Sequence, residues 1–202
     1  MPVQQVYFSW LNRLRQLWPH ERITRVRNMA WLMAGLWVAK SIHLSRVALH
    51  LPLPIQKASV ERRLSRFLHN RAVRVAVWYE PVARQLVAQA VATLGDVRLV
   101  LDTTPVHHRA QVVIVSLAFR RRALPLAWIW VNKGRGHSSS VKQMALLARV
   151  RRWIPKGTSV LVVGDNEFGS VALIRQLEAW GWNYSLLSQP DFAGLPPPYV
   201  GR

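Results

Sequence analysis

The spacing of hydrophobic residues changes at Gly95, and this change limits the folds open to the chain. Before Gly95, apolar residues recur at the three- and four-residue spacing of amphipathic helices. After it, short β-branched runs alternate with turn residues and helical segments, a pattern typical of strands joined by helices. We expect a helical region at residues 1–94, an α/β region at residues 95–190 and an irregular tail at residues 191–202.

Proline, serine and asparagine set the expected helix boundaries of the first region. Pro19 ends the first helix, because proline lacks a backbone donor and clashes with the preceding turn. Residues 51–54 (LPLP) are interpreted as a linker. Ser59 is expected to cap the next helix, Asn70 to end it, and Pro81 to kink or divide the last one. The expected helices span about residues 6–17, 21–40, 58–70 and 73–94.

The second region is expected to form a mixed sheet. Three strands come first and predict an antiparallel meander; two helix-to-strand units follow and predict parallel crossovers. Arg120–Arg122 would form the basic turn between the second and third strands, and Ser138 or Ser139 would cap the next helix. The strands are expected at residues 97–102, 111–119, 124–131, 159–163 and 183–187, and the helices at residues 138–153 and 168–180.

The charge of the chain points to a polyanionic partner. The sequence has 28 Lys and Arg against 9 Asp and Glu, which gives a formal net charge of +19. Arginine, which dominates the basic residues, binds phosphate through a two-pronged guanidinium. Nucleic acid is therefore the expected partner, and charge alone fits a ribosomal or structural nucleic-acid binder equally well. The absence of cysteine excludes disulfides, zinc knuckles and cysteine nucleophiles.

Two acids, Asp102 and Asp165, each end an apolar run that is expected to be a strand. Ligands of α/β sheets gather beyond the carboxyl ends of strands, so the two carboxylates would converge if their strands are parallel neighbours. Carboxylate oxygens bind Mg²⁺, and such ions promote displacement at phosphorus. In the structural alternative, Asp102 binds locally to Thr104 and Asp165 caps the helix that begins near Phe168.

The second region resembles the catalytic domain of bacterial insertion-sequence transposases of the DDE type, which have an RNase H-like fold. The matching segments are LVLDTTPV, SLAFRRRALPLAW, VLVVGDNEFGS and LEAWGWNYSLL, and ASVERRLSRFLHN is similar to the helix that precedes that domain. The resemblance covers roughly residues 55–192. It implies an α+β chain in which a helical N-terminal region precedes an incomplete RNase H-like mixed sheet with flanking helices.

The same resemblance implies a function. Asp102 and Asp165 would be catalytic and would bind Mg²⁺ or Mn²⁺. The partner would be double-stranded DNA at the ends of a mobile element, with a homodimer possible and no membrane association. The location would be the bacterial cytoplasm, at the nucleoid. The alternatives are a non-catalytic DNA-binding remnant or regulator, and another RNase H-like nuclease.

The chain departs from the family pattern in three places. The family's third acid, a glutamate in a Tyr-Arg-Glu-Lys signature, has no counterpart here, so we expect a truncated chain that transfers DNA strands poorly or not at all. Asn166 stands where the family usually has arginine, and Leu187 and Ser188 stand near another common arginine. Glu167 is two residues from Asp165 and is better interpreted as complementing a helix dipole than as a substitute acid.

Other arginine, histidine, glycine-rich and tryptophan segments are candidates for DNA, metal or nucleotide binding. Arg62, Arg63 and Arg66 share one helix face and, with Arg120, Arg121 and Arg122, are candidate DNA contacts; a solvated basic surface is the alternative. His107 and His108 fit a loop or phosphate contact better than a metal cluster. Residues 134–138 (GRGHS) lack the ending of a nucleotide-binding loop. Trp128 and Trp130 are interpreted as packing residues.

Overall fold

A computed structural model describes residues 2–107, 110–132 and 139–186 of the chain. The chain divides into two compact units, Met1–Trp78 and Tyr79–Arg202. The division falls inside a helix, whereas the sequence pattern changes at residue 94, where that helix gives way to a strand.

The first unit is helical. The helices α1 and α2 pack through Leu14, Val26 and Ala30. A second cluster, which includes Val47 and Leu64, joins α2 to α3 and α4. The helices are α1 (Val3–Leu17), α2 (Ile23–Ala39), α3 (Leu44–His50), α4 (Lys57–Leu68) and the first turn of α5 (Val75–Leu94).

Several helix ends differ from the sequence expectation. The helix α4 begins after Gln56, which makes no side-chain capping bond, so the predicted Ser59 cap is wrong. It ends before Asn70, whose Oδ1 instead accepts from the backbone N–H of Ala72. Pro81 lies inside α5 and does not divide it. A proline that is followed by more than three turns of well-packed helix can be tolerated, because packing stabilises the helix around the missing bond.

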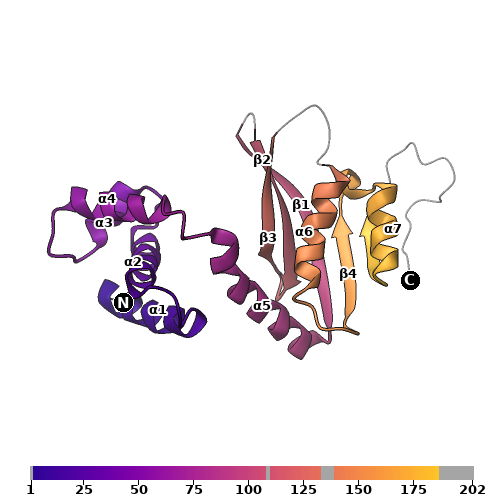
Figure 1. Cartoon of the computed structure of the whole chain (residues 1–202), viewed down its shortest axis with the longest axis horizontal. Coiled ribbons are helices and arrows are strands. Elements are labelled where there is room, and N and C mark those ends of the chain that lie inside the picture. Colours follow the sequence, from indigo (N-terminus) through magenta and orange to yellow (C-terminus); the bar gives the residue numbers. More distant parts are fainter. Residues whose placement is uncertain (1, 108–109, 133–138, 187–202) are drawn as a thin grey trace. The chain divides into compact units, whose positions relative to one another are not determined.

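The second unit is a five-stranded mixed sheet with helices (Figure 1). Its strand order is β3-β2-β1-β4-β5; β1, β2 and β3 are antiparallel neighbours, while β1, β4 and β5 are parallel. This confirms the predicted α+β class and is consistent with an RNase H-like fold. The elements are β1 (Asp96–His107), β2 (Ala110–Phe119), β3 (Arg122–Asn132), α6 (Ser140–Arg151), β4 (Ser159–Gly164), the 3₁₀-helix η1 (Asn166–Phe168), α7 (Val171–Ala179) and β5 (Asn183–Leu186).

Two elements of the sheet region were predicted with wrong bounds. The strand β1 continues past Asp102 to His107, because residues from Asp102 to Pro105 still pair with β2. The expected helix at residues 168–180 is split: η1 ends before Gly169, and α7 starts after Ser170, whose Oγ accepts from the N–H of Leu173 at 3.4 Å. Ser139 caps α6, as expected.

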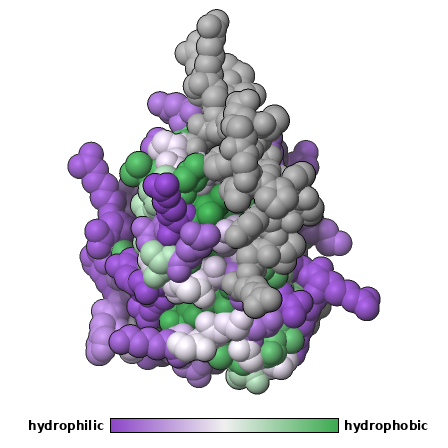
Figure 2. Space-filling view, turned by 90° about the vertical axis from the view of Figure 1, so that its right-hand side faces the viewer, coloured by the Kyte–Doolittle hydropathy of each residue, from purple (hydrophilic) through white to green (hydrophobic). Residues whose placement is uncertain are grey.

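One face of the sheet carries the main core. Alternate strand residues, such as Leu99, Val115 and Val162, are fully buried with residues of α5, α6 and α7. The helices α6 and α7 lie on the same face, as right-handed crossovers require, and Figure 1 shows both in front of the strands. Figure 2 shows the α7 side of the molecule, where hydrophilic side chains surround small apolar patches.

Candidate functional site

Asp102 and Asp165 are next to paired residues on neighbouring parallel strands. Leu101 of β1 is in register with Gly164 of β4, and each aspartate is the next residue along its chain. The strands run in the same direction, so both carboxylates lie at the carboxyl end of the β1–β4 pair. This is the arrangement that convergence of the two side chains requires.

The alternation of side chains puts both aspartates on the face opposite the main core. Leu101 is buried, and the Cβ direction of Gly164 leads to Phe168 and Leu186, so both point into the core. Successive strand residues point to opposite faces. Asp102 and Asp165 therefore share the other face, and both are exposed.

We refer to this second face as the open face, because many of its residues along β1 and β4 are exposed or half-buried. Arg98 and Val163 are exposed there, and Val100 is half-buried. On β3, Trp130 lies on the same face and is 63% exposed, so it is not a core residue, and packing at an interface stays a prediction for it. An extended ligand can therefore reach the aspartates along this face.

Each aspartate also makes a local hydrogen bond. The Thr104 hydroxyl donates to Asp102 Oδ2 at 3.5 Å, and the backbone N–H of Glu167 donates to Asp165 Oδ1 at 3.0 Å, which caps η1. The local contacts of the structural alternative are thus present. They use one oxygen of each carboxylate, so the other oxygen takes no part in them, and these contacts are compatible with cation binding.

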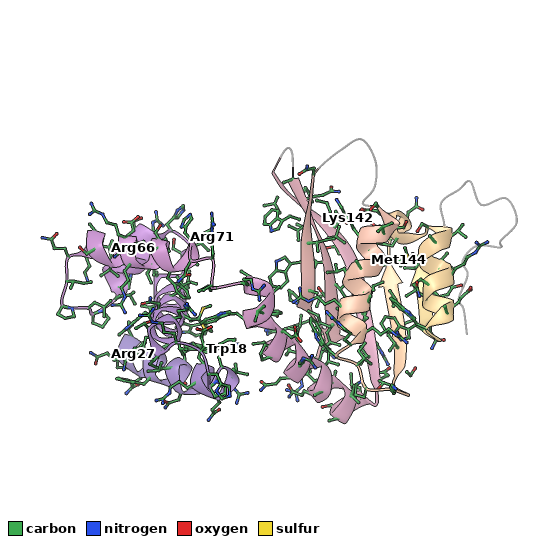
Figure 3. The ribbon with its side chains drawn as sticks, in the orientation of Figure 1. Trp18, Arg27, Arg66, Arg71, Lys142 and Met144 are labelled. Atoms are coloured by element: carbon green, nitrogen blue, oxygen red, sulfur yellow. The ribbon has the colours of Figure 1, made fainter. Side chains whose placement is uncertain are left out.

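The segment after Asp165 is held by packing beneath it. Phe168 is fully buried in the main core. Gln143, buried in the first turn of α6, donates from Nε2 to the carbonyl of Glu167 at 3.5 Å. Figure 3 marks its neighbours Lys142 and Met144 on α6. The backbone that carries Asp165 is therefore tied to both the core and α6.

The acids of the described residues form no three-ligand cluster with one another or with histidine. Glu167 lies within η1, and its placement there agrees with a role at a helix start more than with that of a third ligand. Two exposed carboxylates supply the hard oxygen donors that Mg²⁺ and Mn²⁺ prefer, and Mg²⁺ normally keeps several waters. The residue types at the site therefore fit a divalent cation with two protein ligands.

Some of the predicted positions lie outside the described residues. These are His108, residues 134–138, Leu187, Ser188 and the tail at residues 191–202, while for His107 only the backbone, in β1, is described.

The arginines of α4 line two clefts in the first unit. Arg62 and Arg66 are exposed and line a shallow cleft with Ser59 and Ser65. Arg63, whose Nε donates to Asn28 Oδ1 at 2.8 Å, lines a second cleft of about 230 Å³ together with Arg66 and two arginines of the α2 region. Those two arginines are Arg22 and Arg25, which no sequence motif marks as binding residues. Figure 3 shows Arg66 on α4.

Glu21 reduces the charge of the second cleft only in part. Partial burial alone would raise the pKa of Glu21, but hydrogen bonds from Arg25 and from the backbone N–H of Arg22 outweigh it, and the pKa is lowered. The Arg25–Glu21 ion pair is 2.7 Å long. Arg22, Arg63 and Arg66 still leave the cleft basic.

The arginines at the β2–β3 turn lie away from the aspartates. Arg120 and Arg121 form the turn and Arg122 begins β3, at the end of the sheet where β1 starts. Asp102 pairs with Ile114, five residues from the end of β2 at Phe119. A strand rises about 3.4 Å per residue, so the turn is about 17 Å along the sheet from Asp102. The two groups cannot hold the same phosphate.

No protein-family model matches the chain, and no curated protein matches it either. Among solved structures, the chain is similar to a piggyBac transposase in a synaptic complex with hairpin DNA. The TM-score is 0.40 at 10% identity, over 96% of this chain and 50% of that chain, so this chain spans half the length of that transposase chain. A likeness of this degree adds nothing to the site assignment. No helix in the described part of the chain has the length and apolar character needed to cross a membrane.

Proposed function

We propose that the chain is a DNA-processing protein of the transposase type, which acts on double-stranded DNA at the ends of a mobile element. One observation carries the proposal: Asp102 and Asp165 follow residues that pair across two parallel strands, and they share an exposed face in a chain with a net charge of +19. A strongly basic chain attracts DNA, while a pair of exposed carboxylates is suited to a divalent cation.

Asp102 and Asp165 are the residues proposed to hold Mg²⁺ or Mn²⁺. A cation bound to them would supply Lewis-acid stabilisation of charge on phosphoryl oxygens during phosphodiester cleavage and strand transfer. The carboxylates would position the cation, and Thr104 and the N–H of Glu167 would orient the carboxylates. The candidate DNA contacts on α4 and at the β2–β3 turn would bind the DNA backbone away from the cation.

Binding of Mn²⁺ to the full chain tests the site directly. Mn²⁺ binding, followed by electron paramagnetic resonance, should weaken at least tenfold in Asp102→Asn and in Asp165→Asn. Asp96→Asn is the control, because Asp96 is a half-buried aspartate at the other end of β1, where it pairs with Arg98 at 3.0 Å. Equal Mn²⁺ affinity in all four proteins would remove the proposed cation site.

A non-catalytic DNA-binding protein is the second candidate function. It is favoured by the absence of a three-acid cluster among the described residues and by the local hydrogen bonds of both aspartates. Nicking of supercoiled plasmid in Mn²⁺ separates the two. The transposase proposal expects weak nicking, because the chain has only two of the three acids, and expects Asp102→Asn and Asp165→Asn to abolish it with DNA affinity retained. DNA binding with no nicking in any protein supports the second candidate.

A further inference from the structure

A cleft lined by four arginines lies at the end of the sheet remote from the aspartates. It measures about 320 Å³ and is lined by Arg98 of β1, by Arg120, Arg121 and Arg122 at the β2–β3 turn, and by apolar residues that include Phe119. One guanidinium group can donate two parallel hydrogen bonds to the oxygens of a phosphate. Several guanidinium groups around one cleft therefore form a site for the backbone of a polyanion.

The turn itself carries its arginines in an unfavourable backbone conformation. Phe119 pairs with Arg122, so Arg120 and Arg121 are the whole loop, and their φ angles are +50° and +61°. Positive φ at both positions is typical of a type I′ two-residue hairpin loop, which favours Asn-Gly because a Cβ atom is strained in that region. Here both positions hold long cationic side chains instead. Turn formation alone does not explain that choice, whereas a ligand for the cations does.

The charge of the cleft is only partly balanced. Asp96 Oδ2 accepts from Arg98 Nε at 3.0 Å. The guanidinium of Arg120 lies 5.1 Å from the centre of the Phe119 ring, a contact that orients the side chain and keeps its charge. Within the described parts of the chain, the ion pair found at these four arginines is that of Arg98 with Asp96. The cleft therefore keeps an excess of positive charge.

We propose that this four-arginine cleft binds backbone phosphates of a DNA segment that flanks the segment held at Asp102 and Asp165. Arg98 and Asp102 are four residues apart on β1, so both side chains lie on the open face. A duplex bound along that face would contact both residues. The separation of about 17 Å along the strands makes the cleft a second contact on the same DNA. The inference rests on the proposed function, since it takes DNA as the partner.

The double variant Arg120→Asn/Arg121→Gly tests the cleft, because its two expected effects have opposite signs. Relief of the two strained residues should raise the melting temperature by a few degrees. Loss of two phosphate contacts should weaken binding of a labelled duplex roughly tenfold or more at moderate salt and reduce the slope of log K against log salt by about 1.8. Mn²⁺ affinity should not change. Arg122→Ala, which leaves the turn intact, should reduce the slope by about 0.9.

Arg152→Ala/Lys156→Ala is the matched control, because it removes the same charge from exposed residues between α6 and β4. If the two double variants lose DNA affinity and salt dependence equally, only net charge matters and the cleft is not a phosphate site. That result would leave the proposed cation site at Asp102 and Asp165 unaffected. Weakened Mn²⁺ binding in the turn variant, or a lowered melting temperature, would also contradict it. A wild-type chain that binds no duplex would overturn both this inference and the proposed function.

Discussion

Gly164, the last residue of β4, has no room for a side chain. A Cβ atom there would lie 3.0 Å from Phe168 Cδ2 and 3.1 Å from Leu186 Cδ2. Both neighbours are buried in the main core, so neither can move freely. Gly164→Ala should therefore destabilise the protein by about 1–3 kcal/mol, as overpacking of a core does. Urea unfolding of the full chain measures the change.

The effect at Gly164 should be specific to the core side of β4. Val163 is adjacent but lies on the open face and is 38% exposed, so Val163→Ala should cost less than about 1 kcal/mol. If Gly164→Ala is as stable as the wild type, the close approach of Phe168 is wrong. Because Gly164 precedes Asp165, the same variant should also lower Mn²⁺ affinity, which Val163→Ala should leave unchanged.

Sequence reasoning at the residue scale found the two aspartates but not their surroundings. An acid at the end of an apolar run is visible in the sequence, and so is the parallel pairing that brings two such ends together. The sequence does not show which face a side chain takes, because that depends on the register of Leu101 with Gly164. Arg98 and Arg22 were missed for a similar reason: each joins its cleft only through contacts distant in sequence.

At the scale of elements, Tyr79 ties α5 to the edge strand β3. Its hydroxyl donates to the carbonyl of Pro125 at 2.6 Å, and its ring packs edge-to-face on Trp128 at 5.1 Å. Tyr79→Phe keeps the ring contact and removes the hydrogen bond, so it should destabilise the protein by about 1 kcal/mol. Thermal unfolding at neutral pH measures this loss; an unchanged melting temperature would show that the bond contributes nothing.

The half-buried side chain of Tyr79 predicts that the stability of the fold decreases at alkaline pH. Burial raises the pKa of Tyr79 above its usual value of 10.0. A group with a raised folded-state pKa stabilises the fold fully below its unfolded-state pKa and loses that contribution as pH rises through its folded-state pKa. The wild type should therefore lose stability above about pH 10 more steeply than Tyr79→Phe. Parallel curves for the two proteins would contradict this coupling.

Element types were predictable from spacing, but element ends were not. The strand β1 extends beyond its run of apolar residues, because β2 continues to pair with polar residues such as Thr104. The helix α4 starts at Lys57 without the help of Ser59, because burial of Val60 and Leu64 against α2 and α3 outweighs the missing cap. The split between η1 and α7 follows from the Gly169-Ser170 pair, which the apolar spacing alone does not reveal.

At the scale of the whole molecule, the carboxylate pair opposes the charge that attracts DNA. With a net charge of +19, most of the surface favours a phosphate backbone, whereas Asp102 and Asp165 are exposed and repel it. A divalent cation at the pair would turn this repulsion into attraction. Binding of DNA and of the cation should therefore be coupled, each raising the affinity for the other by the same factor.

This coupling predicts how Asp102→Asn/Asp165→Asn binds duplex DNA. Without divalent cations, the variant should bind more tightly than the wild type, because two exposed repulsive charges of about 0.2–1 kcal/mol each are removed, which amounts to roughly 2- to 30-fold. Adding Mg²⁺ at constant ionic strength should raise the affinity of the wild type and leave that of the variant nearly constant, so that the two curves converge or cross. Fluorescence anisotropy with one labelled duplex measures both. If Mg²⁺ changes the two affinities equally, the cation acts on the DNA alone and the aspartates do not bind it. If the variant binds DNA more weakly than the wild type without divalent cations, the negative charge of the aspartates does not face the DNA.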